Sequence, residues 1–440
     1  MPAIVKILVV FAGMLALARL RVPLGLALIV GSATLNLWAG ATPAETMLTL
    51  WRALFESDLW LLLVITILIE MSRFVTEGRN AQELMAAAQR WGGRHGRIAT
   101  LVALPAVIGL IPMAAGALVS APFVQQASIG SDRPAAWKAA VNYWFRHIWE
   151  FWWPLYPGVI VAMSIFGLDT WQFMTALLPF TPVAAVAGYF FLIRPHISAL
   201  TAPATAAAGN NRRALLILLP LLVTVVAMLA LPFPLKMFWP GLHPGTRKML
   251  AMLIGLTSGL GLILADEWRV ARTAVPAAEE TGIRRRMFST LRDPAALNII
   301  ITLAGGLLFK TLLEQSRLLP SASHELMATG IPVGVAVAGL PFLAGFITGM
   351  SVGFAGTAFP LVIGLLSVPG SKLTPWATLV LAYGFGYAGM MLSPVHLCLL
   401  ATKDFFVSAL PPIYRHVWPC VAVIILYSIA AHILLLLANW

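Results

Sequence analysis

The sequence predicts an all-α polytopic membrane protein with about ten transmembrane helices and two re-entrant helical hairpins, arranged as two inverted repeats. Three observations predict this fold. Hydrophobic residues make up 60% of the chain and charged residues only 10%. Apolar segments long enough to cross a bilayer, about 17 to 25 residues, recur along the whole chain. A weak internal repetition also recurs at a constant offset of 240 residues.

The composition excludes a water-soluble domain, because such domains contain about 25% charged residues, whereas this chain of 440 residues has a mean hydropathy of +0.88. The net charge of +12 comes mainly from short loops between the apolar segments, so it indicates topology rather than a nucleic-acid partner. Cys398 and Cys420 lie in apolar stretches without a CxxC pattern. They therefore predict neither disulfides nor a metal site.

The segments divide the chain into two repeats joined by a linker. The first repeat, residues 1–198, contains expected spans near residues 4–19, 22–40, 58–76, 139–165 and 171–193. The Ala/Thr/Pro-rich linker covers residues 199–213. The second repeat, residues 214–440, contains expected spans near residues 214–232, 248–265, 295–313, 375–400 and 414–438. Residues 4–19 have no small-x-small cleavage site behind them, so we interpret them as an uncleaved span.

Two further apolar segments, residues 98–130 and 330–370, are interrupted by Gly, Pro and Ser. Each is expected to be a helical hairpin that enters the membrane and returns, because irregular backbone at that depth needs protein or water to satisfy its polar groups. With both hairpins re-entrant, the basic loops fall on one side, which predicts a bacterial-type inner membrane with both termini outside. Each repeat then has an odd number of crossings, so the second copy is inverted.

The repetition pairs Gly109 with Gly349, Tyr143 with Tyr383, and Pro154 with Pro394. In inverted-repeat transporters the substrate binds near the midplane, where half-helix N-termini favour an anion. We therefore expect substrate to contact small and hydroxyl residues near the hairpin tips: Ala115, Gly116, Ser120, Ser351, Gly356 and Thr357. The alternative is that these small residues only allow close helix packing.

A charged stripe runs through the fourth span. Asn142, Arg146 and Glu150 recur at a spacing of four residues and share one helical face. Arg146 is expected to hold an anionic group, because a guanidinium stays charged and binds carboxylate or phosphate through two hydrogen bonds. Alternatively, Arg146 and Glu150 neutralise one another, or Arg146 reaches the nearby interface. Glu150 and His147 could carry a coupling proton, or each could make a structural hydrogen bond.

Prolines are expected to interrupt two matching spans. Pro154 and Pro157 should break the fourth span and free backbone carbonyls, and Pro394 should break the ninth beside Ser393 and His396. Ser393 and His396 are therefore further substrate-binding candidates, with an ordinary proline kink as the alternative. No enzyme signature such as GxSxG, HExxH or a Walker A loop is present in the sequence. We therefore expect a gradient-driven carrier without a metal or cofactor, using sodium or protons for coupling.

Three motifs resemble a known family: Pro112-Met-x-x-Gly-Ala-x-x-Ser-Ala-Pro122, Tyr143-Trp-Phe-Arg-His-x-Trp-Glu150 and Leu392-Ser-Pro-Val-His-Leu-Cys398. They resemble the ion-transporter superfamily of secondary carriers and, more closely, its branch called domain of unknown function 401. The resemblance implies a moving unit of about residues 98–193 and 330–440, elevator-type alternating access and a homodimer.

The function predicted from the sequence is therefore secondary active transport of a small organic or inorganic anion, driven by a proton or sodium gradient. The expected partners are this solute and membrane lipid. Two alternatives are a lipid-phosphate translocase, which would need a groove open to lipid, and a non-transporting membrane enzyme or assembly partner.

Overall fold

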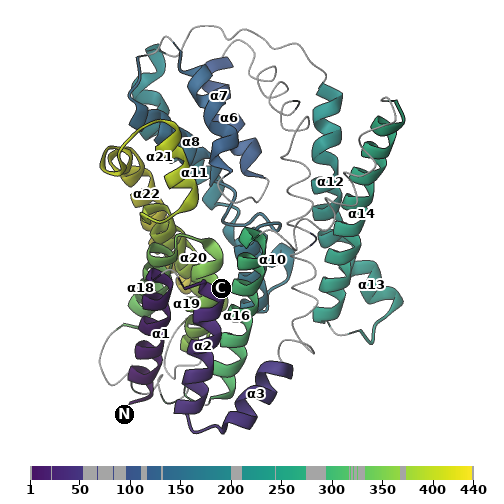
Figure 1. Cartoon of the computed structure of the whole chain (residues 1–440), viewed down its shortest axis with the longest axis vertical. Coiled ribbons are helices and arrows are strands. Elements are labelled where there is room, and N and C mark those ends of the chain that lie inside the picture. Colours follow the sequence, from purple (N-terminus) through teal and green to yellow (C-terminus); the bar gives the residue numbers. More distant parts are fainter. Residues whose placement is uncertain are drawn as a thin grey trace.

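The computed structural model is all-helical over the residues that it describes, with no strand among them (Figure 1). This agrees with the predicted all-α class. The expected span 58–76 lies outside the described residues except for Ile67, as does most of the linker. The described residues are 2–20, 22–52, 67, 83, 96–110, 116–129, 132–199, 211–242, 244–273, 294–316, 318, 321, 325, 332–366 and 373–438.

Helices follow the predicted segments closely. In the first half they are α1 (Ala3–Arg19), α2 (Leu24–Trp38), α3 (Pro43–Arg52), α6 (Gly96–Gly109), α7 (Ala117–Ala127), α8 (Ala135–Arg146), α9 (Pro157–Phe166), α10 (Thr170–Leu177) and α11 (Phe180–Gly188). A π-helical turn, η3 (Tyr189–Ile193), and a 3-10 turn, η4 (Arg194–Ala199), extend α11. In the second half they are α12 (Asn211–Ala230), α13 (Pro232–Phe238), α14 (Pro244–Thr273), α16 (Pro294–Gln315), α18 (Val333–Thr348), α19 (Ser351–Leu366), α20 (Pro375–Leu392), α21 (Leu397–Phe405) and α22 (Leu410–Leu437).

Several of these helices have the length and hydropathy of membrane spans. Within the described part of the chain, four helical stretches qualify, and a fifth does if the bent pair Leu215–Ala230 and Pro232–Phe238 forms one span. The four are Thr170–Ile197, Met249–Asp266, Pro375–Phe405 and Leu410–Leu437. Large apolar side chains also face outward, including Leu426 and Leu434 of α22. Such side chains suit contact with lipid, and the chain is a multi-pass membrane protein.

Both interrupted segments form pairs of packed helices. The first segment gives α6 and α7, and the second gives α18 and α19. Figure 1 shows the α6–α7 pair towards one end of the long axis and the α18–α19 pair towards the other. The second reversal is shorter than expected, because only Gly349 and Met350 separate the two helices and α19 continues through Pro360. A re-entrant path for either pair stays a prediction.

Each hairpin packs against helices of both halves. The first helix of each hairpin packs on the interrupted helix of its own half, α6 on α8 and α18 on α20. The second helix of each hairpin packs on the other half, α7 on α21 and α19 on α9. The helices also begin at matching positions: α8 and α20 start at Ala135 and Pro375, and α9 and α21 at Pro157 and Leu397, intervals of 240 residues in both cases.

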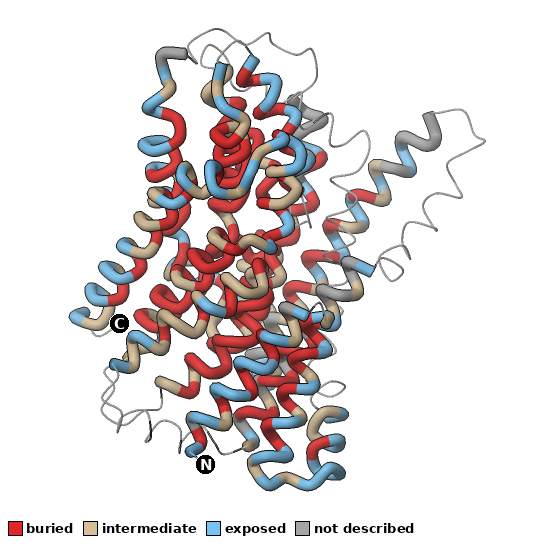
Figure 2. Tube along the Cα trace, turned by 60° about the vertical axis from the view of Figure 1, so that its left-hand side comes forward, coloured by how far each residue is buried: buried red, intermediate tan, exposed pale blue. Residues whose placement is uncertain are grey.

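Buried residues run along the interior from one hairpin to the other, while the outer helices expose much of their surface (Figure 2). The deepest part lies where α8, α9, α20 and α21 meet. Trp144, Phe145, Tyr383 and Tyr387 are among the fully buried side chains there. Arg146, the last residue of α8, is therefore inside the protein rather than at its surface.

Candidate functional site

Two helices are interrupted at the centre of the protein. Helix α8 ends at Arg146, residues 147–156 form turns, and α9 begins at Pro157. Helix α20 ends at Leu392, and α21 begins after a short break at residues 393–396 that contains Pro394. The predicted interruptions are confirmed. Pro157 occupies the first turn of α9, where its missing N–H costs nothing, because first-turn N–H groups have no intrahelical acceptor.

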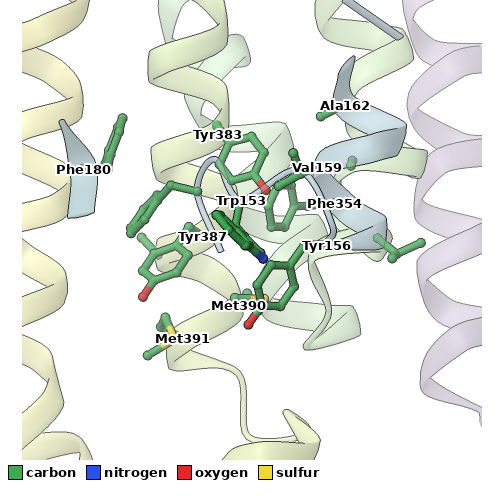
Figure 3. Close-up of a cluster of buried hydrophobic side chains, with 14 of the residues drawn as sticks. Trp153, Tyr156, Val159, Ala162, Phe180, Phe354, Tyr383, Tyr387, Met390 and Met391 are labelled. Atoms are coloured by element: carbon green, nitrogen blue, oxygen red, sulfur yellow. The ribbon is translucent and has the colours of Figure 1, made fainter. Parts of the chain in front are cut away.

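Tyrosine hydroxyls bond the carbonyl groups that these interruptions release. Tyr383 of α20 donates to the carbonyl oxygen of Glu150 at 2.7 Å, and Tyr387 donates to that of His147 at 3.3 Å. Tyr143 of α8 donates in the opposite direction, to the carbonyl oxygen of Met391 at the end of α20, at 3.1 Å. Figure 3 shows Tyr383 and Tyr387 beside the interrupted segment. The repeat pair Tyr143 and Tyr383 therefore makes reciprocal bonds between the halves.

This reciprocity gives a testable expectation. Replacing Tyr383 by Phe should lower the free energy of unfolding by about 1 to 3 kcal/mol, because the buried carbonyl of Glu150 loses its donor. The measurement is thermal unfolding in detergent. Tyr427→Phe is the matched control. Tyr427 packs against the buried ring of Phe180, as Tyr383 does against that of Phe173, but Tyr427 is only partly buried. Equal destabilisation by both substitutions would contradict a bridging role for the Tyr383 hydroxyl.

The first helix of each hairpin ends against one of these breaks. Tyr156 donates a short hydrogen bond to the carbonyl oxygen of Gly109, where α6 ends. A Cβ atom on Gly109 would lie 2.1 Å from the carbonyl oxygen of Arg146, so the two backbones are in contact. In the second half, Gly349 adopts a left-handed φ of 65° and lies against Ser393 and His396. Only a glycine fits both requirements there.

The charged and imidazole side chains predicted as site residues from the sequence lie close together between the two helix breaks. Arg146 is 1% exposed, and its Nη1 donates to the carbonyl oxygen of Ile108 at 3.4 Å. His147 Nε2 lies 3.2 Å from His396 Nε2 and 3.9 Å from Glu150 Oε1. All four side chains are buried. The structure therefore brings together Arg146, His147 and Glu150 from the first interrupted helix and His396 from the second.

Cys398 completes this group, although its sequence context predicted neither a disulfide nor a metal site. The Sγ atom of Cys398 and one ring nitrogen each of His147 and His396 lie within 4.8 Å of one another, and all three residues are buried. The His396-x-Cys398 spacing is the only local signal in the sequence, and it is weak without the third residue. We call Arg146, His147, Glu150, His396 and Cys398 the central cluster.

Asn142 closes one side of the central cluster. Its amide nitrogen donates to the carbonyl oxygen of Ala117 on α7 at 2.9 Å and to Thr402 Oγ1 on α21 at 3.3 Å. Its Oδ1 atom is buried without a hydrogen-bond partner among the described residues. Asn142 thus links α7, α8 and α21, one helical turn from Arg146.

A cavity of about 410 Å³ lies at the ends of the same three helices, near the last residues of α7 and α21 and the first residues of α8. Lys138 lies one turn before Asn142 on α8, and Gln125 lies near the end of α7, so the cavity and the central cluster are on opposite sides of the Asn142 contact. Among the described residues, its lining contains one cation and no acidic residue: Gln125, Ala135, Lys138, Phe405, Phe406 and Val407.

The remaining predicted site residues lie in helix-packing positions. Gly116 precedes α7, Ser120 donates to the carbonyl oxygen of Ala117, and Thr357 donates to that of Gly353 in its own helix. Ser351 packs on Gly158 of α9, and Gly356 on Gly306 of α16. Ser393 Oγ accepts from the N–H of Val395. Ala115 lies outside the described residues. Substrate contact by these residues stays a prediction.

A helical chain with several apolar spans and a buried charged cluster where two interrupted helices meet is an all-α polytopic membrane protein. The chain belongs to the family described as Protein of unknown function (DUF401), whose model matches residues 3–236 and 248–436. The predicted resemblance to this family is thereby confirmed. Membership of the wider ion-transporter superfamily stays a prediction.

Among solved structures, the chain is similar to one described as "Crystal structure of the Alcanivorax borkumensis YdaH transporter reveals an unusual topology". The two share 13% sequence identity with a TM-score of 0.49, over 86% of this chain and 83% of that one. No curated protein matches the chain.

Proposed function

We propose that this protein is a secondary active transporter of a small anionic solute and that Arg146 in the central cluster is its anion-binding residue. A buried guanidinium between two interrupted helices carries the proposal. Charged side chains inside membrane proteins are costly, and they characteristically face a binding site or pathway. Arginine suits carboxylate, phosphate or sulfonate groups, because its planar fork binds two oxygens at once.

The surroundings of Arg146 support an anion rather than a cation as the solute. In the described part of the chain, the cavity at the ends of α7, α8 and α21 is lined by Lys138 and by no acidic residue. A cationic wall raises the local concentration of anions and speeds their entry. Asn142 is the proposed barrier between this entrance and Arg146. Its amide nitrogen bonds α7 and α21, and its Oδ1 atom lacks a partner in the described structure. Separation of these three helices would open the route.

The packing of the two halves supports a proposal of alternating access. Each hairpin contacts an interrupted helix of both repeats, so α6–α9 and α18–α21 form one interlocked unit. We propose that the two repeats are inverted and that this unit moves against the other helices in an elevator-like manner, in the inner membrane and as a homodimer. We propose a proton or sodium gradient as the driving force, with Glu150 and His147 as the groups nearest to the solute that could couple to it.

Transport by proteoliposomes is the direct test. The purified protein should move at least one of a set of organic carboxylates, phosphate and sulfonates under an imposed proton or sodium gradient, recorded as current on a solid-supported membrane. Arg146→Gln should reduce this current about 10- to 100-fold, because a charge-assisted pair is worth about 1.5 to 3 kcal/mol and tenfold corresponds to about 1.4 kcal/mol. Lys138→Met should raise the half-saturating concentration a few-fold and preserve the maximal current.

Two results would refute the proposal. One is an absence of current with every anion under both gradients in protein that stays monodisperse. The other is wild-type current in Arg146→Gln. Arg146→Lys separates charge from geometry: it keeps the cation and loses the two-pronged contact, so we expect an intermediate current.

A further inference from the structure

The two imidazole rings of the central cluster face each other in an arrangement that neutral histidines disfavour. His147 Nδ1 lies 2.6 Å from the carbonyl oxygen of Tyr143, and His396 Nδ1 lies 3.3 Å from that of Met390. A carbonyl oxygen can only accept a hydrogen bond, so in both rings Nδ1 carries the proton and donates. The two Nε2 atoms, 3.2 Å apart, then both present a lone pair to the same point. A positive species between them would remove this repulsion.

The geometry between the two Nε2 atoms matches that of a bound metal ion. Two imidazole nitrogens bound to one tetrahedral zinc, with bonds of about 2.0 to 2.1 Å, are about 3.3 Å apart. The observed separation of 3.2 Å is close to this value. Cys398 Sγ provides a third donor, within 4.8 Å of one ring nitrogen of each histidine. A shift of about an ångström in the cysteine side chain would bring it to a Zn–S bond of about 2.3 Å.

The supporting contacts are those of a metal-binding histidine pair. Ligating histidines almost always donate their second ring N–H to a carbonyl or carboxylate, which fixes the tautomer and the ring orientation. Here Tyr143 and Met390 provide those carbonyls, and the ring of Tyr143 packs edge-on against both imidazoles at 4.8 and 5.3 Å. Each ring is thus held with Nε2 directed at the shared point.

The charges of the cluster also suit a thiophilic cation. Binding converts the Cys398 thiol to a thiolate and releases one proton to solvent. Glu150 Oε1, 3.9 Å from His147 Nε2, adds a second negative charge beside the site. The thiolate and the carboxylate together offset the two positive charges of a divalent ion, and the guanidinium of Arg146 leaves the cluster with one net positive charge. Two nitrogens and one sulfur select zinc or copper(I) over the hard cations calcium and magnesium, which prefer oxygen.

We propose that His147, His396 and Cys398 bind one thiophilic transition-metal ion of the zinc class, held at the meeting point of the two interrupted helices. Three protein ligands leave the fourth position open, as in zinc sites that exchange a ligand. When the ion is bound, His147 and His396 serve as its ligands, and Glu150 is the other of the two proposed coupling groups that stays free to carry a proton. The proposal does not depend on the anion-transport function, since metal binding is measured without transport.

Metal content and cobalt spectroscopy test this site on the full-length protein in detergent. After treatment with a chelator, the wild-type protein should take up one Zn²⁺ per chain. Co²⁺ in place of Zn²⁺ should give a thiolate-to-cobalt charge-transfer band in the near ultraviolet and visible bands of a tetrahedral complex. The cobalt spectrum reports sulfur ligation in the wild-type protein, so this readout needs no variant that folds.

Matched variants locate the ligands. Cys398→Ser and His396→Gln should each weaken zinc binding at least tenfold. Cys420→Ser and His432→Gln should leave it unchanged, because Cys420 and His432 are also buried but lie on α22, where His432 bonds the carbonyl oxygen of Ala377. Folding of each variant is checked by gel filtration and by its unfolding midpoint.

Three outcomes would overturn the proposal. The first is less than stoichiometric zinc in the wild-type protein, which is also the result expected if a shared proton alone separates the two imidazoles. The second is a cobalt complex without the sulfur charge-transfer band. The third is equal loss of zinc in Cys398→Ser and Cys420→Ser.

Discussion

Truncation of Phe151 to Ala should lower the free energy of unfolding by about 3 to 5 kcal/mol. Phe151 is fully buried in the interrupted segment between α8 and α9. Its ring stacks on Phe180 with centroids 4.7 Å apart and lies 4.0 Å from the ring of Tyr387. The substitution leaves a cavity between α11, α20 and the broken span, which a well-packed interior cannot close fully. Thermal and denaturant unfolding in detergent measure the loss.

Phe238→Ala is the control for this substitution. Phe238 lies on α13 and is 67% exposed, so its truncation opens no internal cavity. We expect a change of less than about 0.5 kcal/mol, as at other surface positions. Similar midpoints for Phe151→Ala and the wild-type protein would show that the interrupted segment is not part of the cooperative core.

Gly349→Ala should be strongly destabilising at the second hairpin, because it combines backbone strain with a steric clash. A residue other than glycine in the left-handed region costs about 1 to 2 kcal/mol. The added Cβ would also lie 2.8 Å from the backbone nitrogen of His396 and 3.0 Å from Ser393 Oγ, and overpacking of this kind costs about 1 to 3 kcal/mol more. We therefore expect a total loss of about 2 to 5 kcal/mol, measured by unfolding, and a shift of His396 away from His147.

Gly167→Ala isolates the backbone part of this effect. Gly167 ends α9 with a φ of 66°, almost the same as the 65° of Gly349, but has no neighbouring atom within 4 Å of the position a Cβ would take. It should cost only about 1 to 2 kcal/mol. If the two variants are equally stable, contact between the hairpin and the break at residues 393–396 does not contribute to stability.

The sequence predicted the helical class and most helix positions because membrane insertion imposes a one-dimensional rule. A span must be apolar over about 20 residues, and that can be counted along the chain. The prolines likewise marked both interruptions, since a proline cannot continue hydrogen bonding within a helix. Arg146, His147 and Glu150 could be singled out because charged groups are rare in such segments.

The sequence was less informative about the hairpins. Gly, Ala and Ser near residues 349–360 suggested a long irregular tip, but the reversal occupies only Gly349 and Met350, and Ser351, Gly356 and Thr357 lie within α19. In these positions small residues allow close approach, as Gly356 does against Gly306. Composition alone does not distinguish a loop from a tightly packed helix, because both favour small side chains.

By itself, the sequence determined that this chain spans a membrane many times, where its helices break and which charged residues lie inside. These are local properties, set by hydropathy and by backbone chemistry. Only the tertiary structure decided that Cys398 joins His147 and His396, that Tyr143 and Tyr383 bridge the breaks, and that Asn142 bonds both α7 and α21. The physical reason is that these contacts depend on how two distant helix breaks are oriented in space, which the order of residues along either one does not specify.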